Sequence, residues 1–309
     1  MKKPVDLSII IGTYNSRELI RKTLRSIYQH TKRITFEIIL IDDASTDGTY
    51  HDIHALFPKI TVLRNAKNLG YSKTYNKGTK LAKGRYILHL NSDVLFTKNS
   101  QLWRMIAFMD DHPKVGIAGC KVLKHNQQLD LPCRHAVPTI KNVFFQTFGL
   151  YALFPFVKKL NYYMTYTNES HTTEVGGVLG AFMLIRRKTW KDVGRLDERF
   201  YMYCEDTDYC YRAIQSGWKV YYYPHIAIMH IHGGTTRQFR FKAVYLFHKG
   251  MMHYYRKHYA HHHITMANTF VYTGILLRFL LFVGVESVQY FTTQVVSGIR
   301  RYYLLLSLD

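Results

Sequence analysis

Short apolar runs alternate with amphipathic stretches along the first ninety residues. Runs rich in apolar residues, each bounded by polar or glycine-containing turns, occupy 5–12, 36–41, 60–64 and 85–90. Runs of this length are typical of buried strands. The stretch after residue 16 and the stretch over 71–83 have the apolar spacing of helices. This alternation predicts an α/β fold with a Rossmann-like, mainly parallel central sheet.

The pattern is less regular after residue 93. Residues 131–170 are rich in Tyr, Phe and Pro. They fit a variable loop region beside a site and, equally, a structural insert. The further predicted elements are, in order, a helix at 100–111, a glycine turn with a strand at 174–187, a helix at 205–216, a strand at 219–223 and a short strand before His230.

The composition changes again near residue 240, which predicts one domain over 1–240 and a helical extension over 241–309. The extension is basic and aromatic, and its apolar run from Phe270 to Val285 is interrupted by Arg278. A bilayer span takes about 20 apolar residues. The run is shorter, so a helix lying in the membrane interface is favoured over a span. A docked core helix or a homodimer contact is the alternative.

The charge balance points to an anionic partner. The chain has 42 Lys+Arg against 21 Asp+Glu, a formal net charge of +21, which favours nucleic acid or acidic lipid headgroups. No helix-turn-helix, zinc-finger or RNP pattern supports nucleic acid. We therefore expect an anionic membrane surface and no nucleic acid. The four cysteines form no CxxC pair, and no signal peptide is visible, so we expect a cytoplasmic protein.

Candidate chemistry lies where the predicted strands end. Asp43 and Asp93 follow two of the strands, and parallel sheets bind ligands beyond their carboxyl ends. We therefore expect both carboxylates in one crevice. A second acidic cluster around Asp206 and a histidine at 230 complete the material of a metal-assisted site. Carboxylate and imidazole ligands suit Mn²⁺ or Mg²⁺, which usually complete their shell with substrate phosphates.

Several segments together resemble inverting family 2 glycosyltransferases of the GT-A fold. Ser8–Asn15, Ile41–Thr49 and Leu90–Asp93 are similar to the opening of that family, and Asn68–Gly70 and Gly84–Tyr86 agree with it. The later segments Phe200–Arg212, Gly217 and His230–Thr236 resemble its bacterial rhamnosyltransferase-like branch. The resemblance covers about residues 5–240.

The resemblance implies roles for individual residues. Asp93 would hold the metal on the donor diphosphate together with His230, with His232 as the substitute ligand. Asn91 stands where the family's metal motif has its first acid. Asp206 matches the acid assigned as general base, and Glu205 is its neighbour. The implied donor-binding residues are Gly12, Thr13, Tyr14, Asp43, Asn68, Gly70, Ser92 and Asp93.

The resemblance implies transfer of a sugar, with rhamnose as the best guess, from dTDP-rhamnose or a UDP-sugar. The acceptor would be a hydroxyl of a polyprenyl-diphosphate-linked saccharide, in cell-wall or surface polysaccharide synthesis at the inner face of the membrane. A nucleotidyltransferase is an alternative, although Gly12–Asn15 has no glycine-rich phosphate loop. The pattern also leaves open a non-catalytic protein that binds a sugar nucleotide or nucleic acid.

Several candidate residues also have structural explanations. Asp206 could cap its helix, because acids favour helix N-termini. Asp208 is expected to pair with Arg212, four residues on. Asp42 and Asp47 suit turns and caps. We expect His89 to be structural and the histidines of 261–263 to form a solvated face.

Overall fold

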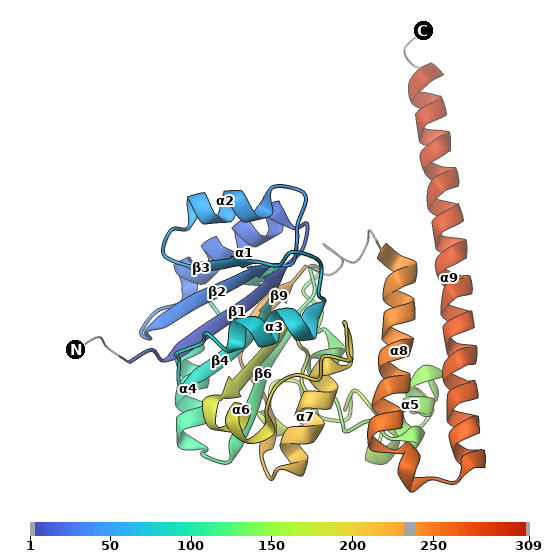
Figure 1. The fold of residues 1–309 in the computed structure, drawn as a ribbon. Helices are drawn as coiled ribbons and strands as arrows, with labels where there is room; N and C mark the ends of the chain where they lie inside the picture. Colours follow the sequence, from blue (N-terminus) through green and yellow to red (C-terminus); the bar gives the residue numbers. More distant parts are fainter. Residues whose placement is uncertain (1–3, 232–238, 307–309) are drawn as a thin grey trace. The chain divides into compact units, whose positions relative to one another are not determined.

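The computed structural model describes residues 4–231 and 239–306, with 293–306 as backbone only. The chain divides into two compact units, Met1–Thr235 and Thr236–Asp309. The first unit is an α/β structure with helices on both faces of a central sheet (Figure 1). The second unit is helical.

The sheet of the first unit has the strand order β3-β2-β1-β4-β8-β6-β9-β5, and β7 pairs with β9. Neighbouring strands from β3 to β4 are parallel, as are β6 and β9. The strands are β1 (Leu7–Thr13), β2 (Phe36–Asp42), β3 (Thr61–Arg64), β4 (Tyr86–Asn91), β5 (Val94–Phe96), β6 (Val115–Leu123), β7 (Thr173–Glu174), β8 (Phe182–Arg186) and β9 (Lys219–His230). The predicted α/β class is confirmed, but the sheet is mixed and not mainly parallel, because β8 pairs antiparallel with β4 and β6, and β9 pairs antiparallel with β5 and β7.

The helices of the first unit follow the predicted alternation. Helix α3 packs on β1 and β2, where Gly78 leaves room for Ile10 and Ile41. The helices are α1 (Arg17–His30), α2 (Thr49–Leu56), α3 (Tyr71–Thr79), α4 (Leu102–Asp111), α5 (Ile140–Thr147), α6 (Arg187–Val193) and α7 (Glu205–Gln215). Short 3-10 turns are η1 (Leu131–Cys133), η2 (Leu150–Leu153) and η3 (Lys158–Leu160).

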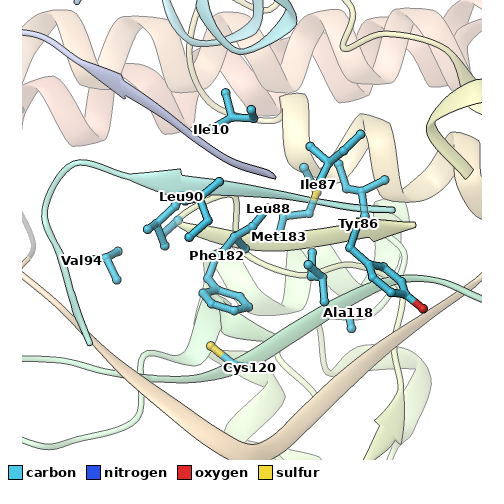
Figure 2. Packing of buried hydrophobic residues seen from close by; sticks show 14 of the residues in the cluster. Ile10, Tyr86, Ile87, Leu88, Leu90, Val94, Ala118, Cys120, Phe182 and Met183 are labelled. Atoms are coloured by element: carbon cyan, nitrogen blue, oxygen red, sulfur yellow. The ribbon is translucent and has the colours of Figure 1, made fainter. Parts of the chain in front are cut away.

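The core continues from the parallel strands into the mixed part of the sheet. Figure 2 shows Leu88 and Leu90 of β4 beside Phe182 of β8, with Ala118 and Cys120 of β6 close by. All five side chains are buried. Burial of apolar surface at about 25 cal/mol per Å² stabilises this arrangement. The same packing holds β4, whose end carries the candidate metal ligand, rigidly in place.

Two features of the middle region differ from the prediction. Strand β6 was not expected, because its glycines weaken the strand pattern. In the structure, a Cβ atom at Gly116 would lie 2.7 Å from Thr189 Oγ1, and one at Gly119 would lie 2.7 Å from Val178. Both glycines therefore permit close packing on the sheet. The two strands predicted before His230 are one twelve-residue strand, β9.

The second unit contains the hairpin of α8 (Arg240–His258) and α9 (Thr265–Leu306), joined through η5 (Ala260–His262). Arg278 of α9 bonds His248 of α8 at 2.9 Å and covers the ring of Phe282 at 4.4 Å. The hairpin therefore gives this cation partners within an apolar helix. The histidines of 261–263 are exposed, as expected.

The length argument against a membrane span is wrong. Helix α9 continues well past both ends of the apolar run 270–285. Thr265–Thr292, 28 residues with a mean hydropathy of 1.7, is long and apolar enough to cross a bilayer by length and composition. The interrupting cation that the sequence shows at 278 is paired within the hairpin.

Candidate active site

The ends of β1, β2 and β4 meet at one edge of the sheet. The backbone N–H of Asp43 donates to the carbonyl of Thr13 at 2.8 Å, and Thr23 Oγ1 donates to the carbonyl of Ser92 at 2.8 Å. Ser16 begins α1, but its hydroxyl bonds Thr13 and Ser92 and does not cap the helix. The predicted loops after these three strands are therefore neighbours in space.

The structure gives a packing reason for the glycine at position 12, in addition to the role that the resemblance implies. A Cβ atom at this position would lie 2.8 Å from the ring of Tyr75 in α3. Tyr75 is buried, and its hydroxyl donates to the carbonyl of Leu90 at 2.7 Å. Gly12 thus allows Tyr75 to tie β1 to β4. The half-buried Tyr14 lies beyond it at the end of the same strand.

Asp43 organises the turn that contains Asn68 and Gly70. Its Oδ1 accepts bonds from Asn65 Nδ2 at 2.7 Å and from the Leu69 N–H at 2.9 Å. Its Oδ2 accepts the Gly70 N–H at 3.0 Å. A carboxylate has about four acceptor positions, so these bonds leave one on Oδ2.

The turn also touches the segment that leads to the acidic cluster. Asn68 Oδ1 accepts the hydroxyl of Tyr201, and the Tyr71 N–H donates to the carbonyl of Tyr201 at 2.7 Å. Burial and the nearby Asp43 and Tyr14 raise the pKa of Tyr201. The turn around Asn68 and Gly70 is therefore hydrogen-bonded to the segment around Tyr201 that precedes Glu205.

Gly70→Ala should destabilise the protein more than Gly194→Ala. Both glycines have positive φ values, +81 and +84, a conformation that costs other residues about 1–3 kcal/mol. A Cβ atom at Gly70 would also lie 2.5 Å from the Tyr201 carbonyl oxygen, whereas one at Gly194 would meet nothing within 4 Å. Urea unfolding of both variants measures the difference. Equal losses would show that the turn does not need this close approach.

Asp93 and His230 form a buried pair at the end of β4. Strands β5 and β9 are antiparallel, and Val94 lies opposite His230. This register brings His230 Nε2 to 3.1 Å from Asp93 Oδ1. The Ile231 N–H also donates to the carbonyl of Asp93 at 2.9 Å. The two predicted metal ligands, 137 residues apart in the sequence, are therefore in contact.

A second acid, Asp130, lies on the other side of the His230 ring from Asp93. Its Oδ2 is 3.8 Å from His230 Nδ1, and its side chain is buried. Burial opposes protonation of the ring, but the neighbouring carboxylates of Asp130 and Asp93 outweigh it and raise the pKa of His230 to about 9. The arrangement carboxylate–imidazole–carboxylate fixes the orientation of the ring.

This donor set fits a divalent cation that is shared with a substrate. Asp93 offers a carboxylate oxygen and His230 an imidazole nitrogen, the ligands that suit Mn²⁺ or Mg²⁺. Within residues 4–231 and 239–292, no group of three or more His, Cys, Asp or Glu side chains has the geometry of a metal site. Two protein ligands leave most of the shell to water and phosphate oxygens. His232, the substitute ligand, lies outside the described residues.

Asp206 is held across the site. The Gly180 N–H donates to its Oδ2 at 2.7 Å, and the Thr207 N–H donates to its Oδ1 at 2.7 Å. The N-cap position of α7 is Cys204, so Asp206 lies inside the first turn and is not the cap. A Cβ atom at Gly180 would lie 3.3 Å from Asp206 Oδ2, which explains the small residue there. Asp206 is half-buried and accessible to a substrate.

Glu205 and Asp208 have different surroundings. Asp208 pairs with Arg212 at 2.8 Å, as predicted. Glu205 is buried, and its Oε2 has no hydrogen-bond partner in the described part of the chain. Burial first, and then the charge of Asp206, raise the pKa of Glu205 well above its usual range. Burial therefore favours the neutral form of Glu205, and Asp206 is the half-buried acid of the two.

Buried and half-buried tyrosines lie between the Asp93–His230 pair and the Glu205–Asp206 pair. The rings of Tyr71 and Tyr75 stack with centroids 3.8 Å apart, and Tyr71 donates to the carbonyl of Gly180 at 2.9 Å. Burial raises the pKa of Tyr203 to about 12, with contributions from the charges of Glu205 and Asp93. Glu205 and Asp93 therefore both act electrostatically on the Tyr203 hydroxyl. Tyr71, Tyr75 and Tyr203 therefore form a wall, the tyrosine wall, between the Asp93–His230 pair and the Glu205–Asp206 pair.

The structure brings together the predicted residues from β1, β2, β4, α7 and β9. Asp42 and Asp47 are structural, as expected: Asp42 accepts the Ser45 N–H, and Asp47 bonds the Thr49 N–H at the start of α2. His89 is also structural. It bonds Thr79 at 2.9 Å, and burial lowers its pKa to about 3.

Sequence reasoning missed Asp130 and the tyrosine wall. Asp130 follows β6 in a segment without clear periodicity. No local signal indicates that it meets a histidine one hundred residues later. The tyrosine spacing Tyr71–Tyr75 within a predicted helix was the only available signal of the wall.

Comparisons with known proteins agree with this geometry. Residues 8–194 match the family described as Glycosyl transferase family 2. An N-acetylglucosaminyl-diphospho-decaprenol L-rhamnosyltransferase of Mycobacterium tuberculosis is 25% identical over 246 residues, which are 74% of this chain and 77% of the relative. The Escherichia coli glucosyltransferase WfaP, named as acting on α-D-GlcNAc-diphosphoundecaprenol, is 35% identical over 105 residues, 34% of this chain and 41% of the relative.

Solved structures show the same fold. The mannosyltransferase PcManGT of Pyrobaculum calidifontis, in complex with GDP-Man and Mn²⁺, aligns with a TM-score of 0.56 and 16% identity. That alignment covers 83% of this chain and 64% of the mannosyltransferase. TarS 1-349 of S. aureus, in complex with UDP, aligns with a TM-score of 0.52 and 21% identity, over 80% of this chain and 66% of TarS. The family match extends over more than half of the sequence, and the chain is a member of glycosyl transferase family 2 with the GT-A fold.

Proposed function

We propose that the chain transfers a sugar, with inversion, from a nucleotide-diphosphate donor to a hydroxyl of a lipid-linked saccharide. The observation that carries the proposal is the convergence of the Asp93–His230 pair and Asp206 at one end of the sheet. The relatives named above act on diphosphate-linked lipid saccharides, and they support the acceptor class. Rhamnose, from dTDP-rhamnose, is the proposed sugar, with a UDP-sugar as the alternative donor.

The donor would occupy the end of β1 and β2. The Gly12–Thr13–Tyr14 loop would lie along the nucleoside, and the open acceptor position of Asp43 would take a ribose or base donor. Asp43 also holds the turn with Asn68 and Gly70 in place. Ser92 would border the diphosphate beside Asp93. The donor-binding role of Asp43 is therefore twofold, through the ligand and through the turn.

Asp93 Oδ1 and His230 Nε2 would hold Mn²⁺ or Mg²⁺ against the diphosphate. The ion would neutralise the charge that gathers on the leaving group as a Lewis acid. The bond between the anomeric carbon and the diphosphate oxygen breaks, and a bond to the acceptor oxygen forms. One displacement on the opposite face inverts the anomeric centre.

Asp206 would take the proton of the acceptor hydroxyl. The Gly180 and Thr207 N–H groups orient both of its oxygens, and the side chain is reachable from solvent. Burial raises the pKa of Glu205 and favours its neutral form, so Asp206 and not Glu205 is proposed as the base. A positioned base contributes about 100- to 10,000-fold to the rate.

Asp130→Asn should weaken metal binding without removing a metal ligand. The substitution keeps the shape but loses the negative charge that faces His230 Nδ1 at 3.8 Å. Loss of such a supporting partner typically lowers metal affinity by about 10- to 100-fold. Titration with Mn²⁺ followed by electron paramagnetic resonance measures the change directly. Unchanged affinity in a folded variant would show that Asp130 does not orient the ring.

A transfer assay tests the proposed function. The full chain is mixed with a polyprenyl-diphosphate-linked N-acetylglucosamine, Mn²⁺ and each of dTDP-rhamnose, UDP-glucose, UDP-GlcNAc and GDP-mannose. We expect one nucleotide class to yield an extended lipid product whose new linkage has the inverted configuration. Retained configuration, or nucleotide attached to the lipid in place of sugar, would contradict the proposal.

The helical unit, with its candidate span Thr265–Thr292, is proposed to hold the enzyme at the inner face of the membrane.

A further inference from the structure

A patch of large apolar side chains is exposed on the first unit, away from the helical tail in the sequence. Phe148, Leu153 and Phe156 are 61%, 70% and 91% exposed. We define the aromatic face as the exposed apolar residues of this segment: Ile140, Phe144, Phe148, Leu153, Phe154, Phe156 and Val157. Exposed patches of this kind mark protein or membrane contacts.

The aromatic face is built on an ordered support. Thr139 and Asn142 form a reciprocal capping box at the start of α5. Asn142 is buried, and its Nδ2 donates to the carbonyl of Val137 at 2.9 Å. Helix α5 packs on η2 and η3, and the ring of Phe144 lies 4.8 Å from that of Phe148. The exposed rings are therefore presented by a folded element.

The segment that carries the aromatic face has charges of one sign. Residues 131–168 contain no Asp or Glu. Lys141, Lys158 and Lys159 flank the rings and are exposed. Aromatic and aliphatic side chains with flanking lysines suit the headgroup region of an anionic bilayer. A second copy would place lysines against lysines, and cores of protein interfaces are depleted of lysine.

The segment that supports the aromatic face is hydrogen-bonded to Gly177, three residues before Gly180, whose N–H donates to Asp206. On one side, the His135 N–H donates to the carbonyl of Gly177 at 3.0 Å, and the ring of His135 stacks on Tyr162 at 4.9 Å. On the other, the Ala136 N–H donates to the carbonyl of Tyr162 at 2.8 Å. Burial raises the pKa of Tyr162, with a contribution from the charge of Asp206. The segment is thus part of the wall beside the candidate base.

We propose that the aromatic face is a second membrane contact, which inserts into an anionic bilayer independently of the helical unit. It would bring the wall beside Asp206 close to the headgroups, where a lipid-linked acceptor presents its sugar. This last step rests on the proposed function, whereas the membrane contact itself does not.

Tryptophan quenching by brominated lipid tests the contact in the full chain. Phe156→Trp places an indole on the aromatic face, and Leu56→Trp places one at an exposed apolar position of α2, 49% exposed. With vesicles of phosphatidylcholine and phosphatidylglycerol, we expect quenching of the added emission at position 156 and none at position 56. Vesicle binding without quenching at 156 would overturn the proposal. The membrane contact would then belong to the helical unit alone.

A triple variant separates the contact from the chemistry. Phe148→Ser/Leu153→Ser/Phe156→Ser should lower partition onto the same vesicles by about tenfold or more, because apolar area is lost from the interface. Transfer to a vesicle-embedded acceptor should fall, while transfer to a short-chain soluble acceptor is kept. Unchanged partition, or a dimer in solution that the variant dissociates, would overturn the proposal. Absence of transfer to either acceptor by the wild type would instead reject the proposed function and leave the quenching result valid.

Discussion

Asp206→Asn should abolish most sugar transfer while leaving donor binding intact. The amide keeps the size of the carboxylate but cannot accept the acceptor's proton, so kcat should fall by about 100- to 10,000-fold. Asp206 lies on the acceptor side of the tyrosine wall, and none of its hydrogen bonds within the first unit reaches Asp43 or Asp93 in the described residues. The donor dissociation constant should therefore change little. The melting temperature should fall, because the amide oxygen can accept only one of the Gly180 and Thr207 N–H bonds. Steady-state kinetics and a donor titration measure kcat and the donor dissociation constant, and thermal unfolding measures the melting temperature.

Two comparisons sharpen that result. Glu205→Gln should lose less than about tenfold, because burial raises the pKa of Glu205 and favours the neutral form that the amide resembles. Asp111→Asn, at an exposed position at the end of α4, is the matched control for the loss of one charge. If Glu205→Gln lost as much activity as Asp206→Asn, the proton would pass through the pair and not through Asp206 alone. Wild-type transfer by Asp206→Asn would refute the base assignment.

Asp93→Ala should remove both metal binding and transfer. Asp93 supplies the carboxylate that contacts His230 Nε2, while Asp130 lies on the Nδ1 side of the ring. In the variant, His230 keeps Asp130 beside it but loses the carboxylate that would share the ion. Loss of a group that stabilises transition-state charge costs about 100- to 1,000-fold in kcat, and Mn²⁺ affinity should fall at least as far. Electron paramagnetic resonance and the transfer assay report the two effects.

The outcome must be separated from simple unfolding. Asp93 is buried beside a ring whose pKa is raised to about 9, so its removal also costs stability. Circular dichroism of the variant establishes that it is folded before metal is added. Asp111→Ala controls for a carboxylate lost at a distant site. A folded Asp93→Ala protein with wild-type Mn²⁺ affinity would place the metal elsewhere.

The parallel half of the fold was predictable because its signals are local. The strands that end at Thr13, Asp42 and Asn91 are short apolar runs with polar loops, and the rule for parallel sheets then brings Asp43 and Asp93 to one edge. The Asp208–Arg212 pair was predictable for the same reason, since it depends only on helical spacing.

The remaining features depend on contacts between distant segments. Asp130 lies beside His230 because β6 pairs with the end of β9 and the Asp130 N–H donates to the carbonyl of Val122 in β6. The aromatic face has the sequence pattern of a loop or an insert, since its helix is short and its rings pack on one another. The apolar run understates the length of α9 because polar residues, among them Asn268 and Glu286, border it, although the helix continues through them.

The metal dependence of donor binding tests the central claim most directly. Thermal unfolding of the full chain is followed with dTDP-, UDP- and GDP-sugars, each with Mn²⁺ and with EDTA. A ligand that binds the folded state raises Tm by mass action, by about 2.7 kcal/mol of stability at one hundred times its Kd. We predict a rise in Tm with one nucleotide class, present with Mn²⁺, lost with EDTA and lost in Asp93→Ala. No rise with any donor, or an equal rise in EDTA, would contradict the assignment of Asp93 and His230 as the metal site of a nucleotide-sugar enzyme.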